Sequence, residues 1–163
     1  MALGKSKLEA WRAVIDVHAT LTGSLEEALR EADLPPLSWL NLLWTLDKAP
    51  DKRLRMNELA LLLNLSRGGL TKLVDRLEGA GLVTRATCSS DRRGYHVVQE
   101  STGKDMLAKM WPVYEAELER HLMGSLSDAE AETIRAALTR AARSACELDD
   151  AAGAQEPAAE AAA

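Results

Sequence analysis

The stretch that decides the fold is LNLSRGGLTKLVDRLEGAGLVTR, residues 63–85. Its apolar residues recur at steps of three and four from Leu70 to Leu77, which is the period of a helix with one buried face. Ser66 precedes this pattern and is a preferred N-cap residue, and Gly81 follows it as a typical helix terminator. The stretch therefore predicts a helix from about residue 66 to 80 with a polar face opposite its leucines.

A shorter helix is expected immediately upstream, over residues 58–63, and a short extended piece precedes it at residues 53–56. Asn57 is its expected N-cap, because an asparagine there can accept a hydrogen bond from a free backbone N–H group. Asn64 and Leu65 alone separate the two helices. Such a joint has room for nothing but a tight corner, so the sequence predicts a helix-turn-helix.

Two short runs of β-prone residues follow, at 82–87 and 95–99. The polar stretch CSSDRRG, residues 88–94, separates them and ends in glycine, which is typical of a β-hairpin tip. A helix-turn-helix followed by a two-stranded hairpin is the organisation of a winged helix, in which the hairpin is the wing. The expected tip carries two adjacent cations, Arg92 and Arg93.

Long helices with an apolar stripe are expected on both sides of this unit. Residues 5–30 and 37–46 precede it, and residues 102–122 follow it, with Pro112 expected to bend or break the last of these helices. A final helix begins at a capping box, residues 127–130. The predicted fold class is mainly α with a small β-wing, a winged helix-turn-helix flanked by long N- and C-terminal helices.

The composition argues against several classes of protein. No apolar run approaches the ~18–20 residues of a membrane span, and the first residues lack the apolar stretch of a signal peptide, so a cytoplasmic location is expected. Cys88 and Cys146 form no CxxC pair, and the three histidines have no ligand spacing, so we expect no metal site and no cofactor. The motifs of serine hydrolases, P-loop enzymes and zinc proteases are missing, and we expect no catalytic activity.

Charge is segregated along the chain, although the net charge is -5. Residues 53–104 hold nine Lys or Arg against five Asp or Glu, a net of +4, and the remainder carries -9. An acidic protein is a poor ligand for nucleic acid as a whole. The local excess of cations reverses that expectation for the predicted winged helix.

The polar face of the helix at 66–80 contains small and hydrogen-bonding residues near its start, which allow close approach to a duplex. Gly68 and Gly69 each cost about 1 kcal/mol against alanine inside a helix. Either tight packing or room for DNA explains them, and the following wing favours DNA. Arg92 and Arg93 have two explanations as well: they solvate a loop, or they reach into a narrow minor groove, with Asp91 bracing Arg93.

The motifs T-x-L-V-D-R-L-E, G-L-V-x-R and D-x-R, at these spacings, resemble the MarR family of dimeric winged-helix transcription regulators. The resemblance implies a homodimer that places two recognition helices in successive major grooves of a pseudo-palindromic operator. It assigns major-groove and phosphate contacts to Ser66, Arg67, Gly68, Thr71, Lys72 and Arg76. It assigns the wing contacts to Asp91, Arg92 and Arg93.

The resemblance also divides the chain. It implies an N-terminal dimerisation helix in residues 1–36, a DNA-binding winged helix-turn-helix in 37–101 and C-terminal dimerisation helices in 102–148, while composition predicts a disordered tail in 149–163. The sequence departs from the family just after the wing, where Gln99 and Glu100 replace a usual Leu-Thr pair. Ser101 is then the expected cap of the following helix.

A small-molecule or redox response is a further expectation from the family. The pocket for an aromatic effector would be lined by four candidate residues, and each of them could instead pack in the core: Trp11, His18, Trp39 and Trp44. Trp111 and Tyr114 are assigned to the dimer interface instead. Cys88 lies beside the cationic wing, which favours oxidation, but a small residue at a strand end is the simpler explanation.

The expected function is therefore sequence-specific binding of double-stranded DNA by a transcription regulator, a repressor that a small aromatic ligand releases. Two alternatives stay open. The winged helix can serve protein contact without DNA binding, or the regulator can sense oxidation through a cysteine. The salt dependence of binding distinguishes the first alternative from DNA binding, because the affinity of a protein that contacts several phosphates falls steeply as the salt concentration rises.

Overall fold

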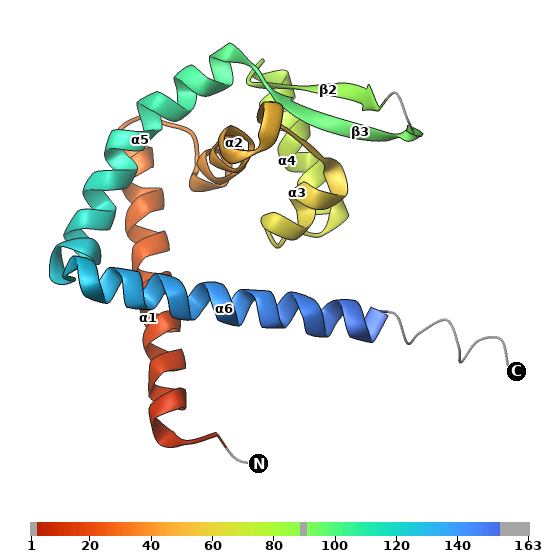
Figure 1. Ribbon diagram of the computed structural model, residues 1–163. Coiled ribbons are helices and arrows are strands. Elements are labelled where there is room, and N and C mark those ends of the chain that lie inside the picture. The colour runs from red at the N-terminus through yellow and green to blue at the C-terminus, as the bar shows by residue number, and fades with distance from the viewer. Residues whose placement is uncertain (1–2, 89–90, 154–163) are drawn as a thin grey trace, which may run out of the picture. The chain divides into compact units, whose positions relative to one another are not determined.

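The computed structural model describes residues 3–88 and 91–153, and the side chains of residues 3–87 and 95–144. Figure 1 shows a mainly helical chain with one small sheet, which confirms the predicted fold class. In chain order the elements are α1 (Lys5–Glu31), α2 (Leu37–Lys48), η1 (Pro50–Lys52), β1 (Arg53–Arg55), α3 (Met56–Leu62), α4 (Arg67–Gly79), β2 (Val83–Cys88), β3 (Asp91–Gln99), α5 (Ser101–His121), η2 (Met123–Ser125) and α6 (Asp128–Gly153). They form two compact units, Met1–His121 and Leu122–Ala163.

The sheet has three antiparallel strands in the order β1-β3-β2. The sequence predicted the short extended piece and the two-stranded hairpin, but not that they pair with each other. The short strand β1 pairs with the base of β3, Arg53 opposite Val98 and Arg55 opposite His96. Strand β3 begins at Asp91, so the four residues 91–94 that we expected in the tip belong to a strand. An irregularity in register between Thr87 and Cys88 accommodates this longer strand.

The helix-turn-helix forms as predicted, with one wrong cap. Ser66 Oγ accepts a hydrogen bond from the Gly69 N–H at 3.1 Å and so caps α4. Helix α3 begins one residue before Asn57, which is therefore not its cap. The N-cap position is Arg55, whose backbone N–H donates to the Glu58 carboxylate at 2.9 Å.

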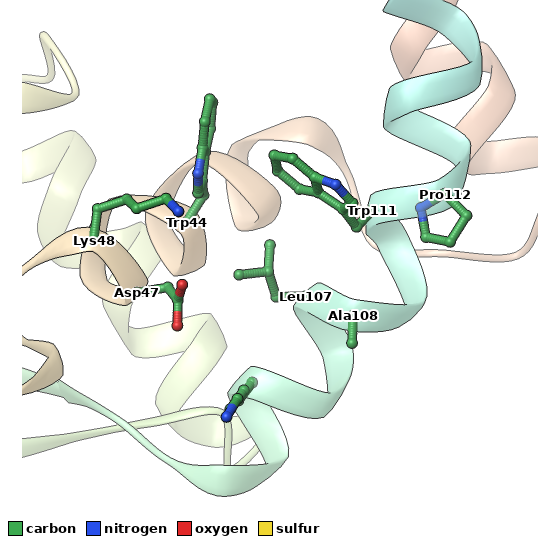
Figure 2. A pocket seen from close by; sticks show the side chains of 8 residues that line it. Trp44, Asp47, Lys48, Leu107, Ala108, Trp111 and Pro112 are labelled. Atoms are coloured by element: carbon green, nitrogen blue, oxygen red, sulfur yellow. The ribbon is translucent and has the colours of Figure 1, made fainter.

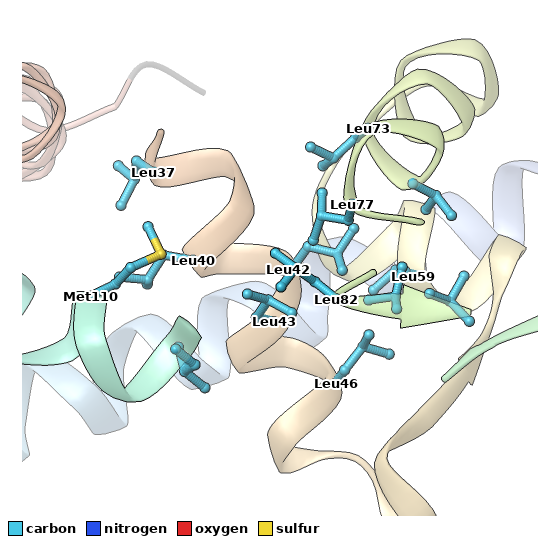
Figure 3. Close-up of a cluster of buried hydrophobic side chains, with 14 of the residues drawn as sticks. Leu37, Leu40, Leu42, Leu43, Leu46, Leu59, Leu73, Leu77, Leu82 and Met110 are labelled. Carbon is cyan, nitrogen blue, oxygen red and sulfur yellow. The ribbon is translucent and has the colours of Figure 1, made fainter. Parts of the chain in front are cut away.

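The core is built mainly from leucine and is centred on α2, which contacts α1, α3, α4, α5 and the sheet. Five leucines of this one helix are buried, and Figure 3 shows them between Met110 of α5 and the leucines of α3 and α4. Each fully buried leucine contributes about 1.5–3 kcal/mol. This packing fixes the angle at which α4 presents its other face to solvent.

Helices α1 and α5 are joined by a polar cluster as well as by apolar contacts. Ser24 of α1 donates a hydrogen bond to the buried carboxylate of Glu117, and its Oγ lies 2.8 Å from His121 Nε2. Hydrogen bonds from Arg120 and from Ser24 hold the pKa of Glu117 below its ordinary value. The carboxylate is therefore ionised at neutral pH and fixes the register of the two helices. Helix α5 continues through Pro112 without a break.

Helix α6 starts at the predicted capping box. The Ser127 N–H donates to Glu130 Oε2 at 2.9 Å, and the Glu130 N–H donates to Ser127 Oγ at 3.4 Å. The helix ends at Gly153, past Asp149, where the tail was expected to begin. Residues 154–163, the rest of that expected tail, lie outside the described residues. No helix in the described part of the chain is long and apolar enough to cross a membrane.

Candidate nucleic-acid interface

Helix α4 has one buried and one exposed face. Its buried residues are the four apolar ones that the sequence predicted, Leu70, Leu73, Val74 and Leu77. All six candidate contact residues at this helix are exposed: Ser66, Arg67, Gly68, Thr71, Lys72 and Arg76. None of the three cations among them forms an ion pair with any residue whose side chain is described. Their charge is therefore available to an anionic partner.

The two glycines of α4 have different causes. A Cβ at Gly69 would meet Ser66 Oγ at 3.2 Å, so this glycine leaves room for the N-cap hydrogen bond. A Cβ at Gly68 would have no described atom within 4 Å. Tight packing within the chain therefore does not explain Gly68. The other explanation from the sequence, room for DNA beside the helix, stays a prediction.

An ion-pair cluster joins α4 to β2, and the sequence did not reveal it. Arg85 Nη2 lies 2.6 Å from Asp75 Oδ1, and Nη1 of the same guanidinium pairs with Glu78. The backbone N–H of Arg85 also donates to Glu78 Oε1 at 3.1 Å. Burial opposes the charge of Arg85, but its hydrogen bond to Asp75 and the charge of Glu78 raise its pKa above the ordinary value. The cluster holds the first wing strand against the end of α4.

The wing candidates are placed only through their backbone. Asp91, Arg92 and Arg93 begin strand β3, with Asp91 opposite Cys88 of β2. Their side chains lie outside the described residues, so the proposed brace between Asp91 and Arg93 stays a prediction, and so does any redox role of Cys88. At the other end of β3, the Gln99 side-chain amide donates to the Leu43 carbonyl at 3.4 Å. The polar residue that departs from the family pattern is thus accommodated against α2.

Comparison with known proteins identifies the fold and shows a similarity to one family. A family model described as "MarR family" matches residues 32–94. AbsC, a MarR family transcriptional regulator from Streptomyces coelicolor, is 29% identical, with a TM-score of 0.77 over 90% of this chain and 99% of that one. Sco3205 from the same organism, solved in complex with DNA, is 26% identical, with a TM-score of 0.77 over 88% and 91%.

The chain is therefore similar to MarR family transcriptional regulators in sequence and in fold. MarR from E. coli shares its fold at 22% identity, with a TM-score of 0.65 over 86% of this chain and 98% of that one. The family model covers α2, α3, α4, β2 and the start of β3, so it spans the exposed face of α4 and the cluster at Arg85. The similarity to the family therefore covers the segment that carries most of the candidate contacts.

A cavity lies between α2 and α5, as Figure 2 shows, and has a volume of about 350 Å³. Its lining residues are Trp44, Asp47, Lys48, Lys104, Leu107, Ala108, Trp111 and Pro112. The rings of Trp44 and Trp111 are 5.2 Å apart in an edge-on arrangement, and Tyr114 packs against both. Burial raises the pKa of the Tyr114 hydroxyl.

The four effector candidates are not brought together. Trp44 lines the cavity, whereas Trp39 lies elsewhere on α2, half-buried against the core. Trp11 and His18 are exposed on α1, Trp11 with 62% of its surface accessible. Trp111 also lines the cavity, and its assignment to a dimer interface stays a prediction. Helical spacing showed that each of these residues lies on an apolar face, but it did not show which element covers that face.

Proposed function

We propose that this protein regulates transcription by binding double-stranded DNA through the exposed face of α4, with the wing beside it. The observation that carries the proposal is the combination of three cations that have no ion-pair partner among the described residues, Arg67, Lys72 and Arg76, with the open space at Gly68. Likeness to Sco3205, which was crystallised with DNA, supports it. Arg93 and Arg92 of the wing, with Asp91, would reach the neighbouring minor groove. In this proposal the protein is cytoplasmic and acts as a repressor by binding near a promoter.

A homodimer is part of this proposal. Leu8, Trp11 and Ile15 follow one another on α1 at helical steps and are all exposed, as are Ile134 and Leu138 on α6. Contiguous exposed apolar surface of this kind marks an interaction site. A second copy of the chain would cover these faces and would place the two α4 helices about 34 Å apart, one turn of DNA, on a pseudo-palindromic operator.

Replacing Lys72 by alanine is expected to weaken DNA binding about fivefold at 0.1 M salt and to reduce the slope of log affinity against log salt by about 0.9, because one phosphate contact is lost. Lys7→Ala is the matched control, since Lys7 is also exposed but lies on α1. Fluorescence anisotropy with a duplex that the wild-type protein selects from a random pool measures both. Equal effects of the two substitutions would contradict the assignment of α4 as the DNA-binding face.

We also propose that an aromatic carboxylate binds the cavity at Trp44 and Trp111 and releases the DNA. The two indole rings supply an apolar wall, and Lys48 and Lys104 supply positive charge. Asp47, the acidic residue of the lining, has its charge offset by Lys52, 3.2 Å from Nζ to Oδ1. The cavity therefore favours an anion with a flat ring.

A series of benzoic and indole carboxylic acids is expected to quench tryptophan fluorescence and to lower DNA affinity over the same concentration range. Trp44→Leu removes ring stacking worth about 1 kcal/mol or more and should weaken ligand binding at least fivefold. Trp39→Leu, on the same helix but outside the cavity, should bind as the wild type does. If the two variants lose ligand affinity equally, the ligand does not occupy this cavity.

A further inference from the structure

A second hollow lies on the helix-turn-helix, between α3 and α4. Its volume is about 230 Å³, and it is lined by Met56, Asn57, Arg67, Leu70 and Thr71. Leu70 is buried and Met56 half-buried, so these two form an apolar floor. Asn57, Arg67 and Thr71 are exposed and form a polar rim.

Asn57 is the residue of this rim that has no role inside the fold. It does not cap α3, because the cap position is Arg55 and Glu58 accepts the N–H of that residue. The Asn57 side-chain amide forms no hydrogen bond with any residue in the described part of the chain. An exposed amide with two free donors and a free acceptor, beside a hollow, is available to a ligand.

The other two rim residues define what the hollow can bind. Arg67 forms no ion pair with a described residue, so its guanidinium is free to bind an anion. Thr71 Oγ1 donates to the Arg67 carbonyl at 2.9 Å, so its proton is in use and its oxygen can only accept. The donors of the rim are therefore Arg67 and Asn57, and they lie above an apolar floor.

A unit with both an anion and a carbon-rich part satisfies this arrangement, and a deoxyribose-phosphate of the DNA backbone is such a unit. A base edge fits less well, because α3 is the first helix of the motif, and that helix crosses the backbone while the second enters the groove. Phosphate and sugar also receive half to two-thirds of all protein–DNA hydrogen bonds.

We infer that Asn57 and Arg67 together hold one sugar-phosphate unit of the DNA backbone, with the sugar against Met56 and Leu70. This inference rests on the proposed DNA-binding function and adds α3 to the binding surface. Asn57 is a positioning residue here: it fixes the register of α4 on the duplex and reads no base. Its contribution is therefore the same for every DNA sequence.

The test compares Asn57→Ala and Asn57→Asp with the wild-type protein on two duplexes, the selected operator and an unrelated sequence of equal length. Asn57→Ala is expected to bind both duplexes about three- to tenfold more weakly with an unchanged salt slope, because a neutral donor is lost. Asn57→Asp should lose more than tenfold, because its carboxylate repels the phosphate. The melting temperature of Asn57→Ala should be unchanged, since the amide has no partner in the fold.

A double-mutant cycle with Arg67→Ala tests whether the two residues share one phosphate. Shared binding predicts that the double variant loses less affinity than the product of the two single losses. Multiplicative losses, wild-type affinity of both Asn57 variants, or a loss confined to the operator duplex would each overturn the inference while leaving DNA binding by α4 intact. Failure of the wild-type protein to bind any duplex would instead overturn the proposed function.

Discussion

Replacing Gly103 by alanine is expected to destabilise the protein by about 3 kcal/mol or more, because the added methyl group has no space to enter. Its Cβ would lie 2.2 Å from the carbonyl oxygen of Leu82 and 3.1 Å from Leu43 Cδ2. The Leu82 oxygen is backbone and is held by a hydrogen bond from the Glu100 N–H at 3.1 Å. Relief of the clash therefore requires α5 to move away from the base of the wing.

Urea denaturation at a fixed protein concentration measures this effect, because the stability of a dimer depends on concentration. Gly79→Ala is the matched control: it lies at the end of α4, and a Cβ there has no described atom within 4 Å. We expect its free energy of unfolding to change by less than about 1 kcal/mol. A Gly103 variant as stable as this control would contradict the prediction, because it would show that the junction between α5 and the wing can accommodate an added methyl group.

The sequence was sufficient wherever the controlling interactions are local. Ser66 and the Ser127–Glu130 box act through hydrogen bonds within one helical turn, and the structure has both. The buried face of α4 follows from spacing alone, because leucines three and four residues apart share a side of any helix. The local sequence was ambiguous at the start of α3, where either Asn57 or Arg55 can occupy the N-cap position. The Glu58 carboxylate accepts the N–H of Arg55 and so favours the earlier start.

The features that sequence did not reveal depend on residues distant in the chain. The extended piece at residues 53–56 was expected, but its partner β3 begins about 40 residues later, so neither run alone indicates that the two pair in one sheet. Arg85 reaches Asp75 and Glu78 across the turn between α4 and β2. Gly103 looks like any glycine in the first turn of a helix, and its close approach to Leu82 becomes visible only when the wing is folded against α5.

The candidate site also contains residues that the sequence could place and residues that it could not. The six residues at α4 were placed by helical spacing together with the family resemblance, and the structure finds all of them exposed. The effector candidates were chosen by residue type. An aromatic residue on an apolar face can pack against any neighbouring element, so its type does not determine whether it meets a cavity or solvent. The structure places Trp111 at a cavity and Trp11 in solvent, which residue type alone did not predict.

Replacing Gly68 by alanine is expected to leave the fold as stable as before, or up to about 1 kcal/mol more stable, and to weaken DNA binding by about 1.4–2.8 kcal/mol, roughly ten- to a hundredfold. Inside the protein the new methyl group meets nothing, because no described atom lies within 4 Å of it. On the DNA it would occupy the space between the first turn of α4 and the duplex. Stability and affinity should therefore change in opposite directions.

This opposition separates a functional glycine from a structural one, because a substitution that damages the fold lowers both quantities. Gly79→Ala again provides the control, since it makes the same chemical change at the far end of the same helix. It should bind the selected duplex as the wild type does, while Gly68→Ala requires about tenfold more protein for half-saturation. If Gly68→Ala binds as tightly as Gly79→Ala, the first turn of α4 does not approach the duplex closely, and the cations at Arg67 and Lys72 would then act only at a distance.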